Sequence, residues 1–75
     1  MARNTIYVGL RPEGGWRAWW KDQPVLSNFN TQKPALDYAV AAAHANQPSE
    51  VMLQRTDGEW ENYATYGDDP FPPRG

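Results

Sequence analysis

The chain has no cysteine, so its 75 residues have to be held together by packing alone. Neither a disulfide framework nor a cysteine-based zinc site can supplement the core. A chain this short buries only about 60% of the surface that it exposes when unfolded, so the core has to be small. Four Trp, four Tyr and two Phe are available for packing, and one large aromatic ring can bury roughly 150–250 Å². We therefore expect a single small domain whose stability depends on its aromatic residues.

Alternation of side chains predicts three strands in the first part of the chain. Residues 5–11 alternate aliphatic side chains with Tyr7 and Gly9, and the Pro-Glu-Gly-Gly run that follows is typical of a turn. Residues 16–21 alternate again, and after a second turn residues 25–29 form a shorter third strand. We expect the three strands to follow one another as an antiparallel meander.

The second of these strands has two different faces. Two tryptophans and an alanine share one face, which is expected to lie on the core. The other face combines an aromatic ring with cations and consists of Arg17, Trp19 and Lys21.

A helix is expected from a cap at Asn30 or Thr31 to about Asn46. Apolar residues recur along it at intervals of three and four, as one buried face of a helix requires. Several are alanines, whose small side chains allow a helix to lie close to a sheet. The stripe consists of Ala35, Leu36, Ala39, Val40, Ala42 and Ala43.

The strongest local pattern is a hairpin. Asp57 and Gly58 favour a two-residue type I′ turn between two strands, at residues 50–56 and 59–66. In that register Trp60 faces the core together with the aliphatic side chains of the earlier strand. The opposite face then consists of Met52, Gln54, Glu61 and Tyr63.

These elements predict an α+β fold. The order β-β-β-α-β-β indicates one antiparallel sheet with a single helix packed on one face, and no parallel crossover is needed. Residues 1–67 form the domain, and residues 68–75 form a proline-rich C-terminal tail that is expected to be extended. The expected core consists of Ile6, Val8, Leu10, Trp16, Ala18, Leu36, Val40, Val51, Leu53 and Trp60.

The tail has the most specific sequence in the chain. Tyr66 and Gly67 are followed by two aspartates and then by Pro-Phe-Pro-Pro. With the Gly-Gly-Trp run at residues 14–16, the alanine-rich helix and the Asp-Gly hairpin, this sequence resembles the small bacterial family catalogued as domain of unknown function 2188. The resemblance spans nearly the whole chain. It implies a stand-alone cytoplasmic protein of a bacterium, plasmid or phage, and it implies no activity.

The ingredients of catalysis and of metal or cofactor binding are few. The chain has one histidine, His44, near the predicted end of the helix, where its cationic form would interact favourably with the helix dipole. Asp68 and Asp69 are adjacent carboxylates without further oxygen ligands, so a solvated acidic pair is the simpler interpretation. We expect a protein that is not an enzyme and that has no cofactor, metal ion or small-molecule substrate.

Charge is distributed unevenly, although the net charge is only −2. The chain through Lys33 is mainly basic, and the remainder is mainly acidic, which predicts a two-sided surface. No apolar stretch approaches the roughly 20 residues that a membrane-spanning helix needs, so we expect a cytoplasmic protein without membrane contact.

The predicted sheet leaves one face without a helix, and this face is the candidate binding surface. Exposed aromatic residues beside arginine are typical of protein interfaces, so a protein partner or a second copy of the chain is the favoured ligand. Rings that stack on bases beside cations that hold phosphates predict a nucleic-acid binder as the alternative. The alternative without a ligand is that the rings pack beneath the proline-rich tail or stiffen an exposed sheet. The candidate partner-binding residues are Tyr7, Arg17, Trp19, Lys21, Tyr63 and Phe71.

A weaker alternative depends on the acidic half of the chain. An acidic surface that meets a basic one would suit a phage or mobile-element inhibitor of a host or defence protein. Its candidate residues are Glu50, Asp57, Glu59 and Glu61.

Overall fold

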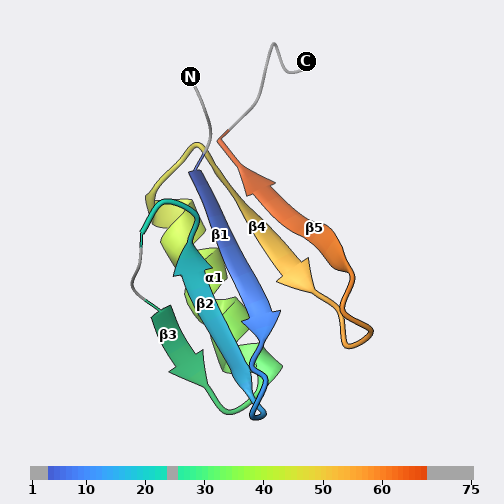
Figure 1. Cartoon of the computed structure of the whole chain (residues 1–75). Coiled ribbons are helices and arrows are strands. Elements are labelled where there is room, and N and C mark those ends of the chain that lie inside the picture. Colours follow the sequence, from blue (N-terminus) through green and yellow to red (C-terminus); the bar gives the residue numbers. More distant parts are fainter. Residues whose placement is uncertain (1–3, 24–25, 68–75) are drawn as a thin grey trace.

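The computed structural model describes residues 4–23 and 26–67, which form one sheet and one helix (Figure 1). The α+β class and the order of the elements are those predicted from the sequence. The elements are β1 (Asn4–Leu10), β2 (Trp16–Trp20), β3 (Leu26–Phe29), α1 (Gln32–Ala45), β4 (Ser49–Gln54) and β5 (Trp60–Tyr66).

The sheet is mixed, and the expectation of a wholly antiparallel sheet was wrong. The strand order is β3-β2-β1-β4-β5, and β1 and β4 are parallel neighbours at the centre (Figure 1). The reason is the length of α1, whose 14 residues span about 21 Å. That is close to the roughly 23 Å of a seven-residue strand. The helix therefore returns the chain to the end of the sheet at which β3 began, and β4 runs in the same direction as β3 and β1.

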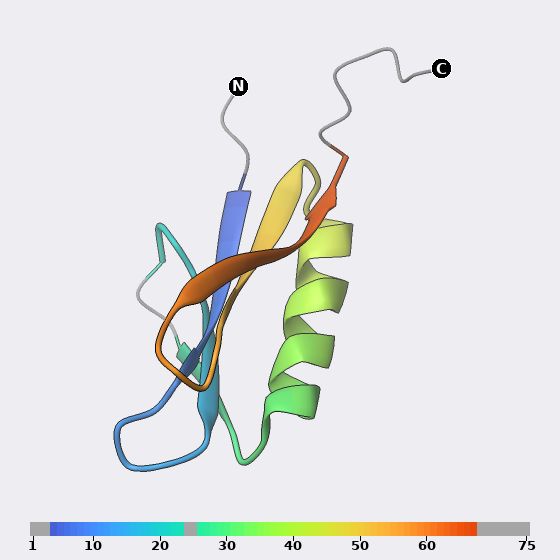
Figure 2. The same ribbon diagram turned by 90° about the vertical axis from the view of Figure 1, so that its right-hand side faces the viewer.

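The core lies between α1 and the face of the sheet that the helix covers (Figure 2). The helix contributes only alanines to the fully buried set, so its backbone lies close to the strands. Leu10, Leu36 and Val40, expected in the core, are only partly buried. The buried apolar residues are Ile6, Val8, Trp16, Ala18, Ala35, Ala39, Ala43, Val51 and Leu53.

Both ends of α1 lie at the positions that the sequence predicts. Thr31 is the N-cap, with extended backbone, although its hydroxyl accepts no capping hydrogen bond. At the other end Asn46 is the C-cap, and its side-chain amide donates to the carbonyl oxygen of Ala42 at 2.7 Å. The buried hydroxyl of Ser49 donates to the carbonyl oxygen of Ala43, which ties the last turn of the helix to the start of β4.

The turn between β4 and β5 is one residue longer than the two-residue turn that the sequence predicts. The N–H of Arg55 donates to the carbonyl of Glu59 at 2.7 Å, so the loop consists of residues 56–58. Gly58 has a φ of +94°, the left-handed conformation that a three-residue hairpin loop places at this position. A shift of one residue moves a side chain to the opposite face of a strand. Trp60 therefore pairs with Gln54, lies outside the core and is 41% exposed.

A β-bulge restores the register later in the same strand pair. Met52 pairs with Asn62, but Val51 pairs with Ala64, so Tyr63 is the extra residue of β5. Its side chain is 49% exposed. In the described part of the chain, no helix is long and apolar enough to cross a membrane.

The close approach of α1 to the sheet generates a stability prediction. Ala39 is fully buried, whereas Ala41 is exposed on the same helix. Ala39→Leu should lower the free energy of unfolding by about 1–3 kcal/mol, because three additional carbon atoms enter a packed interface. Ala41→Leu is the matched control and should change it by no more than about 0.5 kcal/mol. Urea denaturation measures both values, and equal midpoints for the two variants would contradict the packing described.

Candidate binding face

Three aromatic rings meet on the face of the sheet away from α1, which we call the open face. Tyr7 stacks on Trp19, with ring centroids 5.5 Å apart and an interplanar angle of 26°. Trp60 stands edge-on to both rings, at 5.4 Å from Tyr7 and 6.1 Å from Trp19. We call Tyr7, Trp19 and Trp60 the ring cluster. It joins β1, β2 and β5 on the side of the sheet opposite α1, the helix that Figure 2 shows along one face only.

Gly9 forms the floor beneath two of these rings. Its backbone is buried, and a Cβ atom at this position would lie 3.0 Å from the Cη2 atom of Trp19 and 3.1 Å from that of Trp60. Any side chain at Gly9 would therefore push the indoles outward. The absence of a side chain is what lets the two tryptophans meet above β1.

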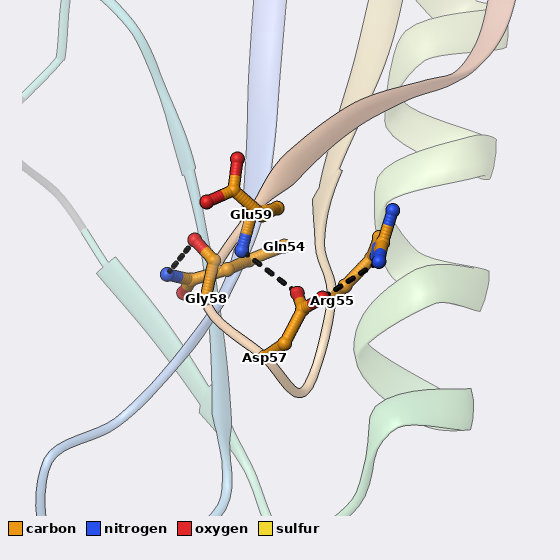
Figure 3. Close-up of polar contacts among 5 residues, drawn as sticks. All are labelled: Gln54, Arg55, Asp57, Gly58 and Glu59. Carbon is orange, nitrogen blue, oxygen red and sulfur yellow. Dashed lines mark hydrogen bonds and ion pairs between the residues drawn. The ribbon is translucent and has the colours of Figure 1, made fainter.

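Hydrogen bonds and an ion pair order the β4–β5 loop, which immediately precedes Trp60 (Figure 3). The side-chain amide of Gln54 donates to the carbonyl of Gly58 at 3.1 Å, while its oxygen accepts the backbone N–H of Leu10 at 2.9 Å. Asp57 accepts the N–H of Glu59 at 3.0 Å and pairs with Arg55 at 2.6 Å. These bonds fix the loop against β1 and β4 immediately before Trp60.

Arg17 supplies a positive charge beside the ring cluster. Its guanidinium carbon lies 5.2 Å from the centre of the Trp19 ring, within the range of a cation–π interaction. Its Nε atom is buried and has no hydrogen-bond partner among residues 4–23 and 26–67. Beyond the end of β1, a hydrogen bond from Arg11 lowers the pKa of the Glu13 carboxyl, and the charge of Arg17 lowers it further. Glu13 is therefore a carboxylate at neutral pH and is already paired with Arg11.

The polar atoms of the ring cluster are two indole N–H groups, which can only donate hydrogen bonds, and one phenol hydroxyl, which can donate or accept. Among the described residues, neither the indole N–H groups of Trp19 and Trp60 nor the hydroxyl of Tyr7 makes a hydrogen bond. Tyr7 and Trp19 are partly exposed, and Trp60 is 41% exposed. The open face thus presents donors beside apolar rings.

Three of the six predicted site residues are brought together, namely Tyr7, Arg17 and Trp19. Lys21 lies just beyond the end of β2, where it lines a small polar hollow of about 170 Å³. Tyr63, at the bulge of β5, has no ring neighbour in the part of the chain that the structure describes. Phe71 lies outside the described residues.

Sequence reasoning missed Trp60 and Leu26 as residues of the open face. The Asp-Gly pattern predicts a two-residue loop, which places Trp60 in the core, whereas the observed loop has three residues. Leu26 pairs with Trp19 and is 48% exposed, so it extends the apolar surface onto β3. The signal in the sequence was the alternation of β3. Residues that pair across neighbouring strands share a face, so the residue opposite Trp19 lies on the open face.

The only histidine packs at the edge of the fold. The His44 ring contacts the Tyr66 ring edge-on at 5.5 Å, on the side of the sheet that α1 covers. Within residues 4–23 and 26–67, no three His, Asp or Glu side chains gather in a group that could hold a metal ion. The open face is therefore the candidate binding site of the described chain.

The floor formed by Gly9 generates a prediction. Gly9→Val should lower the free energy of unfolding by about 1–3 kcal/mol and change the near-UV circular dichroism, because the new methyl groups displace Trp19 and Trp60. Asn28→Val is the control, since Asn28 is exposed on an edge strand and should tolerate the change within about 0.5 kcal/mol. An unchanged near-UV spectrum for Gly9→Val would show that the rings do not rest on Gly9.

Comparisons with known proteins identify a family. The family model described as "uncharacterized protein conserved in bacteria (DUF2188)" matches residues 7–66. Searches of curated proteins and of solved structures gave no significant match. The matched segment ends before the proline-rich tail, and it includes every residue of the ring cluster. Because the match covers most of the chain, this protein belongs to the DUF2188 family of bacterial proteins.

Proposed function

We propose that the chain is a non-enzymatic binding module that contacts a protein partner, or a second copy of itself, through the open face. The observation that carries this proposal is the ring cluster, in which three large rings pack against one another outside the core. Trp60, at 41% exposure, and Leu26, at 48%, add exposed apolar surface to the same face.

The composition of the open face supports a protein ligand. Trp, Tyr and Arg are the residue types that contribute most to binding energy at protein interfaces, and they lie here in one cluster. The rings are also held in place before any ligand arrives, by Gly9 below them and by the loop that Gln54 anchors. Side chains that are already ordered lose less conformational entropy on binding.

The surroundings of the histidine support a role without catalysis. The His44 ring lies against Tyr66 on the side of the sheet that α1 covers, so it contributes no side chain to the open face. The cytoplasmic location and the inhibition of a host or defence protein remain predictions from the sequence.

Self-association gives the first test of the proposal. Light scattering of the unmodified chain should show a mass that rises with concentration, and Trp60→Ala should shift this rise to concentrations at least about tenfold higher, as expected for a central aromatic anchor. Tyr38→Ala is the matched control, because Tyr38 is 43% exposed but belongs to the helix on the other side of the sheet.

A mass that stays monomeric removes self-association and leaves a separate protein partner. Affinity capture with the unmodified chain and with Trp60→Ala then decides. Proteins retained by the first and lost by the second support the proposal. A monomeric mass together with identical capture by both chains would refute it.

Nucleic acid is a second candidate ligand, favoured by one observation. The guanidinium of Arg17 over the Trp19 ring combines a cation with a stacking surface, as proteins that bind single strands do. Glu50 lies on the same face and opposes phosphate. If nucleic acid is the ligand, a labelled single-stranded oligothymidylate should bind, with an affinity that falls steeply with salt and that Arg17→Ala reduces. A shallow dependence on salt, or equal binding by Arg17→Ala, eliminates this candidate.

A further inference from the structure

We propose that the ring cluster binds extended proline-rich peptide segments. This inference rests on the proposed binding role of the open face and names the class of ligand. It follows from two independent properties of the cluster, the angles between its rings and the type of polar atom that it presents.

The three rings do not form a flat surface, because one of them is nearly perpendicular to the other two. Tyr7 and Trp19 are stacked at 26°, whereas Trp60 is turned by 80° from Tyr7 and by 88° from Trp19. Grooves lined by aromatic rings are the sites at which proline-rich segments dock, because flat pyrrolidine rings pack against them. Such segments already adopt the polyproline II conformation when free, so binding orders little additional chain.

All three polar groups of the cluster can donate hydrogen bonds, which suits a ligand that only accepts them. The hydroxyl of Tyr7 and the indole N–H groups of Trp19 and Trp60 are donors without partners among the described residues. The acceptor of the nearby Gln54 side chain is already used by the N–H of Leu10. A proline-rich segment carries carbonyl oxygens that make no internal hydrogen bonds, and each proline lacks an N–H.

Addition of an ordinary β-strand ligand fits the open face less well. An added strand needs alternating donors and acceptors from a backbone edge. Trp60 comes from the edge strand β5, but the two rings that it contacts belong to β1 and β2, and the backbone groups of β1 pair with β2 and β4. A ligand at the cluster therefore meets side chains and not a free strand edge.

The sequence supplies a suitable probe. Pro70, Phe71, Pro72 and Pro73 form a proline-rich run, and they lie outside the described residues. A labelled peptide that copies residues 68–75 tests the site directly. A second peptide with serine in place of each proline has the same charge and is the matched control.

The titration uses the full-length chain carrying Pro70→Ser, Pro72→Ser and Pro73→Ser, so that the chain's own proline-rich run does not compete. Fluorescence anisotropy should show that the proline peptide binds at least about tenfold more tightly than the serine peptide. Trp60→Ala in this background should weaken binding at least about tenfold. Tyr7→Phe keeps the ring and removes only the donor, and should weaken binding roughly two- to tenfold. Tyr38→Ala should bind as the parent does.

Equal affinity for the two peptides, or no binding at about 1 mM, overturns the inference. Full binding by Tyr7→Phe and Trp60→Ala overturns it as well. The wider proposal is tested separately by light scattering and capture with Trp60→Ala. If those experiments succeed while the peptides fail, the open face binds proteins by another chemistry.

Discussion

The close packing of an alanine-lined helix on the sheet is the constraint on which the rest of this structure depends. Ala35, Ala39 and Ala43 are fully buried, so the helix backbone approaches the strands and leaves a thin core. Among the large rings, Trp16 lies in the core, and Trp20, Phe29 and Tyr66 pack against it while only partly buried. Of the four tryptophans, all within the described ranges, Trp16 alone is buried. Of the two tryptophans expected in the core, Trp16 is therefore confirmed, whereas the expectation for Trp60 was wrong.

The rings excluded from the core stabilise the molecule from its other side. Tyr7, Trp19 and Trp60 pack together across the open face, and they connect the meander of β1 and β2 to the hairpin of β4 and β5. Pairs of aromatic rings contribute about 0.5–1.5 kcal/mol beyond the area that they bury. In a chain with few buried residues, such contacts matter for stability. The same contacts hold the rings in the arrangement on which the proposed binding depends.

The length of the β4–β5 loop decides which face of the sheet Trp60 occupies. A loop of three residues instead of two moves this ring from the covered face to the open face. The bulge at Tyr63 then returns the later residues of β5 to the register in which Ala64 lies opposite Val51. Asp-Gly is compatible with both loop lengths, so the sequence pattern did not distinguish them. The hydrogen bonds of Gln54 and Asp57 belong to the longer loop.

The sequence by itself determined the number, type and order of the elements, because alternation, capping residues and turn residues act over short distances. It also determined the two faces of β2, and hence the grouping of Arg17 with Trp19 on the open face. Only the tertiary structure decided that β1 and β4 are parallel, since that pairing depends on where the helix returns the chain. It also decided which rings meet. The ring cluster draws on strands more than 50 residues apart in sequence, from Tyr7 to Trp60, and a contact of that kind is set by register and packing rather than by local pattern.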